Sequence, residues 1–189
     1  MDKTTFFNLA LSLIGGGEYT SEAATASPCE LWYPIVLREA ACRHNWSFSR
    51  KSVTLTQQAD ASYHLPDDCM NILYLRTPSG QKPDTFLIED RRIIGLPTAD
   101  PLTLVYTSDS IALAQELPDA YPEFCVGAAY LLAARIARRI TGDTREVDLC
   151  LREADRQFTL AITRDAQQEK SNKLDSPLLL STKRRSGFA

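Results

Sequence analysis

The stretch YPEFCVGAAYLLAARIARRITGDTREVDLCLREADRQFTLAITRD, residues 121–165, decides the fold because it predicts two long amphipathic helices joined by a turn. The first is predicted over about 121–141. Pro122 suits its first turn, where a missing N–H loses no hydrogen bond, and Gly142 ends it because glycine readily turns left-handed. The second is predicted over about 144–168, with one apolar and one charged face. Together they predict a helical hairpin with a buried seam.

Small residues are frequent on the first of these helices. They allow the backbone of a neighbouring helix to come close, which predicts tight pairing of the two helices. They are Gly127, Ala128, Ala129, Ala133, Ala134 and Ala137.

Six arginines gather at the turn end of the hairpin and are candidates for a subunit interface or a channel lining. They could face the phosphates of nucleic acid. The other interpretation is that they complement helix ends and form pairs such as Glu153 with Arg156 or Arg152 with Asp148, and the interleaved acidic residues favour it. The six are Arg135, Arg138, Arg139, Arg145, Arg152 and Arg156.

Two further helices are predicted before the hairpin, over about 4–14 and 28–44. Thr4 or Thr5 can cap the first. Ser27, Pro28 and Glu30 form a capping-box pattern at the start of the second. Pro34 then requires a kink or a later start. The expected buried face of the second helix comprises Leu31, Trp32, Ile35, Val36, Ala40 and Cys42.

After Asn45 the periodicity changes from helical to alternating, which predicts a β module over about 46–108. A strand is expected to begin around Trp46, whose indole is interpreted as a core anchor. The run 65–68, Leu-Pro-Asp-Asp, matches a type I turn, and Asp90-Arg91 is predicted as a tight hairpin corner. Short connections between strands predict an antiparallel sheet.

These elements predict an α+β fold, mainly α: a four-helix bundle with an inserted small antiparallel β module and an extended C-terminal tail. We expect one domain over residues 1–166 and a docking tail over residues 167–189. The tail opens with a polar spacer and then offers an apolar cluster and a basic cluster, which predicts a segment that docks on a partner. The candidate docking residues are Leu178, Leu179, Leu180, Lys183, Arg184 and Arg185.

Composition narrows the class of protein. The chain has 189 residues, a formal net charge of -3 and 44% hydrophobic residues, which count against a dedicated nucleic-acid binder. The five cysteines are odd in number and lack a C-x-x-C pair, so we expect reduced core thiols in a cytoplasmic setting. Residues 1–14 have neither the cleavage site of a signal peptide nor the length of a membrane span, and no membrane contact is expected.

Reactive chemistry is not indicated. His44 and His64 are the only histidines and lack the spacing of metal ligands. His44 is expected to end its helix. Asp67 and Asp68 are interpreted as serving the backbone of their turn. Because phosphate-binding and nucleophile motifs are also lacking, we expect neither an enzyme nor a cofactor.

Several segments in order resemble one family. They are NLALSLIGGG (residues 8–17), a following helix that leads to HNWSF (44–48), YHLPDDC (63–69), and PEFCVGAAYLLAARIA (122–137) with ITGD (140–143) behind it. Together they look like the head-to-tail adaptor proteins of tailed bacteriophages, often called tail tubular protein A. The resemblance covers roughly residues 4–165, and the tail lies outside it.

The resemblance implies a structural protein of the virion neck, made in the host cytoplasm. It implies a ring of about twelve identical subunits between the portal protein and the tail nozzle or tail tube protein, with a channel for genome passage. Contact with the passing DNA would be transient and non-specific. In such adaptors the C-terminal segment tends to reach the portal, which assigns that contact to the tail.

Another class stays open beside the adaptor. A helical ligand-binding or transcriptional regulatory protein of this length is an alternative, although no DNA-reading helix-turn-helix is recognised near the N-terminus. A strong mobility shift with a specific duplex would favour the regulator. Turnover that is lost on mutating Asp67 or Asp68 would favour an enzyme.

Overall fold

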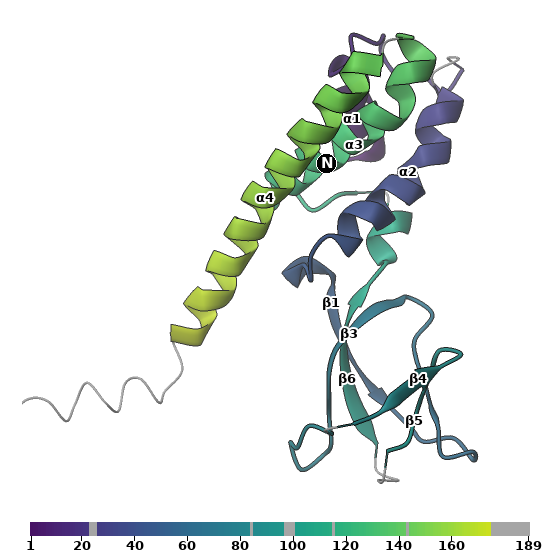
Figure 1. Cartoon of the computed structure of the whole chain (residues 1–189), viewed down its shortest axis with the longest axis vertical. Coiled ribbons are helices and arrows are strands. Elements are labelled where there is room, and N and C mark those ends of the chain that lie inside the picture. Colours follow the sequence, from purple (N-terminus) through teal and green to yellow (C-terminus); the bar gives the residue numbers. More distant parts are fainter. Residues whose placement is uncertain (23–25, 84, 97–100, 115, 143, 175–189) are drawn as a thin grey trace, which may run out of the picture. The chain divides into compact units, whose positions relative to one another are not determined.

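The chain is a mixed α+β protein, seen here as a computed structural model that describes residues 1–22, 26–83, 85–96, 101–114, 116–142 and 144–174. Its elements are shown in Figure 1. Residue contacts divide the chain into a helical unit, residues 1–29 and 118–189, and a β unit, residues 30–117. The described elements are α1 (Lys3–Ser12), α2 (Ala26–Cys42), η1 (Ser47–Ser49), β1 (Arg50–Leu55), β2 (Tyr63–His64), β3 (Cys69–Arg76), β4 (Leu87–Glu89), β5 (Arg92–Ile94), β6 (Leu102–Ser108), η2 (Ser110–Leu113), α3 (Pro122–Ile140) and α4 (Thr144–Leu174).

In the helical unit, α3 and α4 pack antiparallel, as the hairpin predicts. The Tyr121 hydroxyl, just before α3, lies 2.9 Å from Gln168 Oε1 near the far end of α4. The rings of Phe124 and Phe158 meet edge to face with centroids 6.0 Å apart. Helix α1 packs on α3 through a buried face that includes Phe6 and Leu11. The core of this unit is therefore built along α3, most of whose residues are buried.

Gly127 lets α4 approach α3 closely. A Cβ atom at this position would lie 3.2 Å from two ring carbons of Phe158 and 3.3 Å from Gln157 Cβ. Such distances are tighter than ordinary van der Waals contact, so the absent side chain permits the observed spacing of the helices. The expected tight pairing is confirmed at this position.

Two predicted helix starts are wrong. The cap of α1 is Asp2 rather than Thr4 or Thr5, because Asp2 Oδ1 accepts a hydrogen bond of 2.9 Å from the Thr5 backbone N–H. Helix α2 begins at Ala26, so Ser27 lies inside the helix and cannot be its N-cap. Pro34 is accommodated within α2.

Two predicted helix ends are also wrong. Helix α2 ends at Cys42, so His44 lies beyond it. Helix α4 continues to Leu174, so the tail is helical over residues 167–174 rather than extended from residue 167. The segment from Gln167 to Lys173 is rich in Gln, Glu and Lys, which favour helix, and contains neither glycine nor proline. Residues 175–189 lie outside the described part.

In the β unit, two small antiparallel sheets replace the single predicted one. Their strand orders are β1-β6-β3 and β2-β5-β4. Strand β6 lies at the centre of the first sheet and pairs with strands that precede it by many residues. Among the described strands, only β4 and β5 form a pair of consecutive strands, joined by the corner that the sequence predicts. Asp90 and Arg91 have φ values of 44° and 58°, as a type I′ turn requires.

One apolar cluster holds the two sheets together. Its buried members are Leu55, Tyr63, Leu75, Ile93, Leu96, Leu102, Leu104 and Tyr106. Helix α2 is tied to the segment after β6 inside the same unit. The Tyr33 hydroxyl donates to the Ala114 carbonyl at 2.9 Å, and Arg38 pairs with Asp109 at 3.0 Å.

Trp46 is a core anchor, as predicted, but it precedes a 3₁₀ turn rather than a strand. Its indole is fully buried, donates to the Ala40 carbonyl at 3.1 Å and stacks on Phe48 with centroids 5.7 Å apart. The predicted buried face of α2 is partly wrong. Val36 and Ala40 are buried as predicted, but Leu31 is 62% exposed and Ile35 47% exposed, because the helix turns Tyr33 and Leu37 inward instead.

None of the five cysteines, all of which lie in the described residues, forms a disulfide. Cys29, Cys125 and Cys150 are buried, and burial raises the pKa of Cys125 to about 11. The expected core position is wrong for Cys42, which is exposed. Cys69 is half-buried, so it is only partly in the core. Burial also raises the pKa of Cys150, so the thiols of Cys125 and Cys150 are protonated near neutral pH.

The predicted four-helix bundle is not confirmed. Helices α1, α3 and α4 pack in the helical unit, whereas α2 from Glu30 onward belongs to the β unit. None of the helices in the described ranges combines the length and apolar character that crossing a membrane would require.

Candidate functional site

All six candidate arginines are exposed, on the C-terminal half of α3 and the N-terminal half of α4. Because these helices are antiparallel and joined at Gly142, the structure brings Arg135, Arg138 and Arg139 to the same end as Arg145. The four arginines lie at one end because α3 ends at Ile140 and α4 begins at Thr144. The sequence-predicted cluster therefore exists as an exposed basic end of the hairpin.

Local pairing accounts for part of this charge. Arg156 pairs with Glu153 at 2.8 Å, as expected. Arg152 Nε lies 3.3 Å from the main-chain carbonyl oxygen of Asp148, so this contact uses the backbone rather than the expected carboxylate. Exposed ion pairs of this kind contribute only about 0.3–0.5 kcal/mol each. These arginines therefore remain able to meet a carboxylate or phosphate of another molecule.

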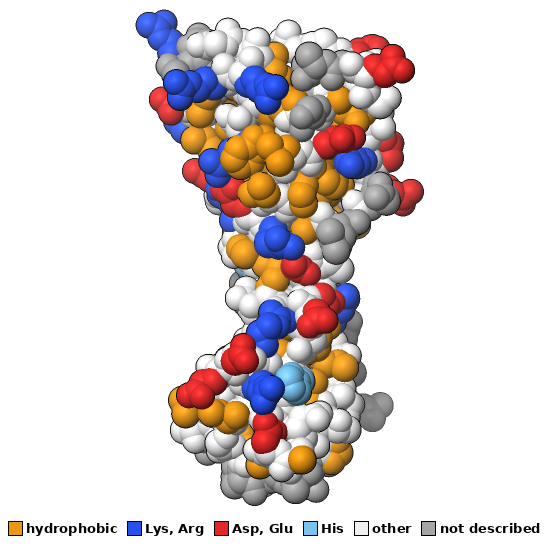
Figure 2. Space-filling view, turned by 90° about the vertical axis from the view of Figure 1, so that its right-hand side faces the viewer, with side chains coloured by type: hydrophobic (Ala, Val, Ile, Leu, Met, Phe, Trp, Pro, Cys, Tyr) orange, Lys and Arg blue, Asp and Glu red, His pale blue; other side chains and the backbone are white. Residues whose placement is uncertain are grey.

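The face shown in Figure 2 is not uniformly basic. On the face shown in Figure 2, basic and acidic side chains are interspersed, and hydrophobic side chains gather between them. Mixed charge of this kind gives weak, salt-sensitive contact with nucleic acid rather than tight binding.

The predicted docking residues of the tail cannot be placed. Leu178, Leu179, Leu180, Lys183, Arg184 and Arg185 lie outside the described residues.

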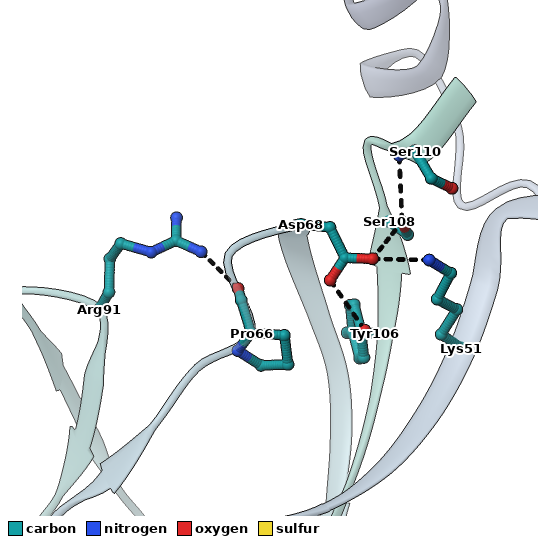
Figure 3. A network of polar contacts seen from close by, with 7 residues as sticks. All are labelled: Lys51, Pro66, Asp68, Arg91, Tyr106, Ser108 and Ser110. Carbon is teal, nitrogen blue, oxygen red and sulfur yellow. Dashed lines mark hydrogen bonds and ion pairs between the residues drawn. The ribbon is translucent and has the colours of Figure 1, made fainter. Parts of the chain in front are cut away.

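A polar network that sequence reasoning missed is centred on Asp68, immediately before β3 (Figure 3). Its Oδ2 lies 2.6 Å from Lys51 Nζ on β1 and 2.8 Å from Ser108 Oγ on β6. Its Oδ1 accepts a hydrogen bond of 2.9 Å from the Tyr106 hydroxyl. One carboxylate thus joins all three strands of the sheet β1-β6-β3.

Electrostatics in this network favour the ionised carboxylate. The hydrogen bond from Lys51 is the main cause that lowers the pKa of Asp68 to about 2, and the bonds from Ser108 and Tyr106 add to it. Burial, followed by the hydrogen bond to Asp68, raises the pKa of Tyr106 to about 12. At neutral pH the network therefore holds an ionised carboxylate and a neutral phenol.

The chain around Asp68 is held by backbone contacts. The Cys69 N–H donates to the Pro66 carbonyl at 3.0 Å, which closes a turn over residues 66–69, one residue later than the predicted turn over residues 65–68. The guanidinium of Arg91, from the β4–β5 corner, donates to the same carbonyl, and the Asp109 N–H donates to the Asp68 carbonyl at 2.9 Å. The interpretation that Asp68 serves only its own turn is therefore wrong, because its side chain contacts β1 and β6.

This network links Asp68 to strands β1 and β6 and so stabilises the sheet. Ser108 and Tyr106 are 0% and 4% exposed, and both hydroxyls already donate to Asp68. The Ser108 oxygen also accepts from the Ser110 N–H at 3.1 Å, which links β6 to η2. The arrangement joins the strands and directs both hydroxyls at the Asp68 carboxylate rather than at solvent.

Metal ligands do not gather anywhere in the described part of the chain. His44 meets the indole of Trp46 edge to face, with ring centroids 5.1 Å apart. A shallow hollow of about 300 Å³ beside β4 is lined by Thr85, Phe86, Leu87 and Gly95. Its lining offers one side-chain hydroxyl, too few polar groups to orient a specific ligand.

No known protein family and no curated protein matches this chain.

Proposed function

We propose that the chain is a structural subunit of a phage head-to-tail adaptor, which forms a ring between the portal and the tail. The observation that carries the proposal is the order of the motifs at residues 8–17, 44–48, 63–69 and 122–143, which resembles that family. The four-helix bundle with an inserted β module belongs to this proposal. So do the location in the virion neck and the assembly in the host cytoplasm.

A ring of identical subunits needs two different surfaces on each copy, because each contact in a cyclic ring joins unlike patches. Exposed charged and apolar side chains can form such contacts between subunits. The arginine end of the α3–α4 hairpin is a candidate for one of them, or for the channel lining. The copy number of the proposed ring is about twelve, as the resemblance implies.

The proposed channel passes DNA without holding it. Each phosphate that a basic side chain neutralises adds salt-dependent affinity, so a strongly basic channel would retain the genome. The formal net charge of -3 and the interspersed surface charges support a channel that makes only transient, non-specific contact with DNA. Its other partners are the portal protein above and the tail nozzle or tail tube protein below.

The proposed contact with the portal is made by the C-terminal segment. Its apolar trio at residues 178–180 and its basic trio at residues 183–185 follow the end of α4 by only a few residues. A docking segment makes assembly depend on the portal, which gathers many copies and raises their effective concentration.

Deletion of residues 176–189 tests this assignment. The truncated chain should lose binding to the purified portal ring of its own phage, measured by co-sedimentation, while its melting temperature stays the same. Replacing Lys183, Arg184 and Arg185 by Ser keeps the length and serves as a matched variant with partial loss. Unchanged portal binding by the truncated chain refutes the tail contact, and a full-length chain that never forms rings with the portal refutes the adaptor.

A further inference from the structure

The outer face of α4 carries an unusual stripe. Leu149 is 55% exposed and Leu160 is 47% exposed, although both are large and apolar. With Glu153 and Arg156 they are spaced by four, three and four residues, which at about 100° per residue places all four on one side of the helix. We call these four residues the α4 stripe.

The α4 stripe lies opposite the face that α3 covers. The buried residues of α4 include Cys150, Ala154, Phe158 and Ala161, which fall about 100–180° around the helix from Leu149. A Cβ atom at Gly127 of α3 would lie closest to Phe158 and Gln157 of α4. Packing within the helical unit therefore leaves the stripe on the outside.

The stripe is self-complementary when the helix is reversed. In an antiparallel pair of α4 helices, the register that places Leu149 against Leu160 of a second copy also places Glu153 against Arg156 of that copy. Two-fold symmetry repeats both contacts, as an interface between identical surfaces requires. Spacing by four and three residues is that of a coiled-coil seam, in which such layers pack side chains between helices.

We propose that the α4 stripe docks a second copy of this chain in an antiparallel, two-fold contact. Charge complementarity identifies a second copy as the partner of the stripe. Each Arg156 lies 2.8 Å from its own Glu153 and would also pair with the Glu153 of the second copy. In the same register Arg145 lies toward Arg164 of the second copy. The repulsion between these two arginines is reduced because Arg164 forms an ion pair with Glu123 at 3.0 Å.

This dimer is distinct from the proposed ring. A two-fold contact closes on itself and cannot propagate around a ring, so it describes a form of the free subunit. A seam of a few helical turns buries less surface than a standard stable interface, so the dimer forms only at high protein concentration. The inference does not rest on the adaptor function.

A charge-reversal cycle tests the contact. Sedimentation equilibrium over about a hundredfold range of full-chain concentration should show a monomer–dimer equilibrium for the native sequence. Glu153→Arg and Arg156→Glu should each weaken dimerisation about tenfold or more, because two attractive pairs become two repulsive ones. The double variant Glu153→Arg/Arg156→Glu restores opposite charges in both pairs and should recover dimerisation.

Asp148→Arg is the matched control. It makes the same charge change on the same helix, but lies about 100° away from the stripe, so it should leave dimerisation unchanged. A native chain that stays monomeric throughout overturns the proposal. So do single variants that dimerise like the native chain, or a double variant that does not recover.

Cross-linking tests the antiparallel register separately, in a Cys42→Ser background that removes the exposed thiol. Mixing Leu149→Cys with Leu160→Cys chains should give a disulfide-linked dimer under mild oxidation. Either variant alone should not, because two identical positions lie about 16 Å apart along the paired helices, beyond disulfide reach. Equal cross-linking of each variant with itself overturns the register.

Discussion

The carboxylate of Asp68 accepts hydrogen bonds from Lys51, Tyr106 and Ser108, and these bonds favour its charged form. Its pKa falls from 3.8 to about 2 on folding, so the folded state gains stability above pH 3.8 and loses it as the pH falls toward 2. Because its side chain is still 31% exposed, solvent screening limits the gain to about 1 kcal/mol. Asp68→Asn should therefore lower the free energy of unfolding by about 1 kcal/mol at pH 7.

Urea unfolding at pH 7 and pH 2 measures this difference. The gap between the native chain and Asp68→Asn should shrink as the pH falls through the range between the two pKa values, since the native carboxylate becomes protonated. Asp67→Asn is the matched control: its neighbouring carboxylate is exposed, and the change should have little effect at either pH. An equal loss for both variants, or a gap independent of pH, contradicts the prediction.

The role of Asp68 was not predictable from the sequence. Its partners lie 17, 38 and 40 residues away, so only the register of β1, β6 and β3 brings them together. The run Leu-Pro-Asp-Asp predicts a turn over residues 65–68, and the hydrogen bond from Cys69 to Pro66 shows a turn one residue later, over residues 66–69. The local sequence therefore predicts a turn near Asp68, whereas long-range strand pairing determines what the Asp68 side chain binds.

At the scale of the elements, the spacing of α3 and α4 depends on Gly127. Gly127→Ala adds a Cβ 3.2 Å from the Phe158 ring, which is buried and in edge-to-face contact with Phe124. Overpacking costs about 1–3 kcal/mol, while alanine regains about 1 kcal/mol of helix propensity. The variant should therefore be less stable by about 1 kcal/mol in thermal or urea unfolding.

A double-mutant cycle separates the steric cost from the helix propensity. Phe158→Leu alone creates a cavity and should destabilise the chain, but Gly127→Ala should cost less in that background because the clash with the Phe158 ring is gone and only the contact with Gln157 Cβ remains. If Gly127→Ala destabilises both backgrounds equally, the close approach to Phe158 is not the cause.

Helices were easier to predict than sheets for a physical reason. The pattern that defines α3 and its end at Gly142 lies within about twenty consecutive residues, and both bounds agree with the structure within a residue or two. Strand pairing is not local: β6 pairs with β1 and β3, and alternation alone does not reveal those partners. The prediction succeeded for the β4–β5 hairpin, where the corner itself joins the strands.

At the scale of the whole molecule, the sequence predicts four helices but not how they group. All four have the apolar positions of packed helices, and periodicity does not say which helix each will contact. The contacts place α2 from Glu30 onward with the strands, where Tyr33 and Arg38 bind the segment after β6. The clustering of the candidate arginines was predictable because they flank one local turn. The candidate tail residues lie outside the described part of the chain.

This grouping predicts that residues 26–117 fold alone. The fragment contains the whole of α2, both sheets and their shared apolar cluster, and it is long enough to bury a core. Its two ends are held together by the hydrogen bond from Tyr33 to Ala114 and the ion pair of Arg38 with Asp109. The fragment should unfold in one cooperative transition and keep the Asp68→Asn effect of about 1 kcal/mol. Tyr33→Phe should weaken it, since the Ala114 contact is lost, while the exposed Leu31→Ala should not; a fragment without a cooperative transition contradicts the grouping.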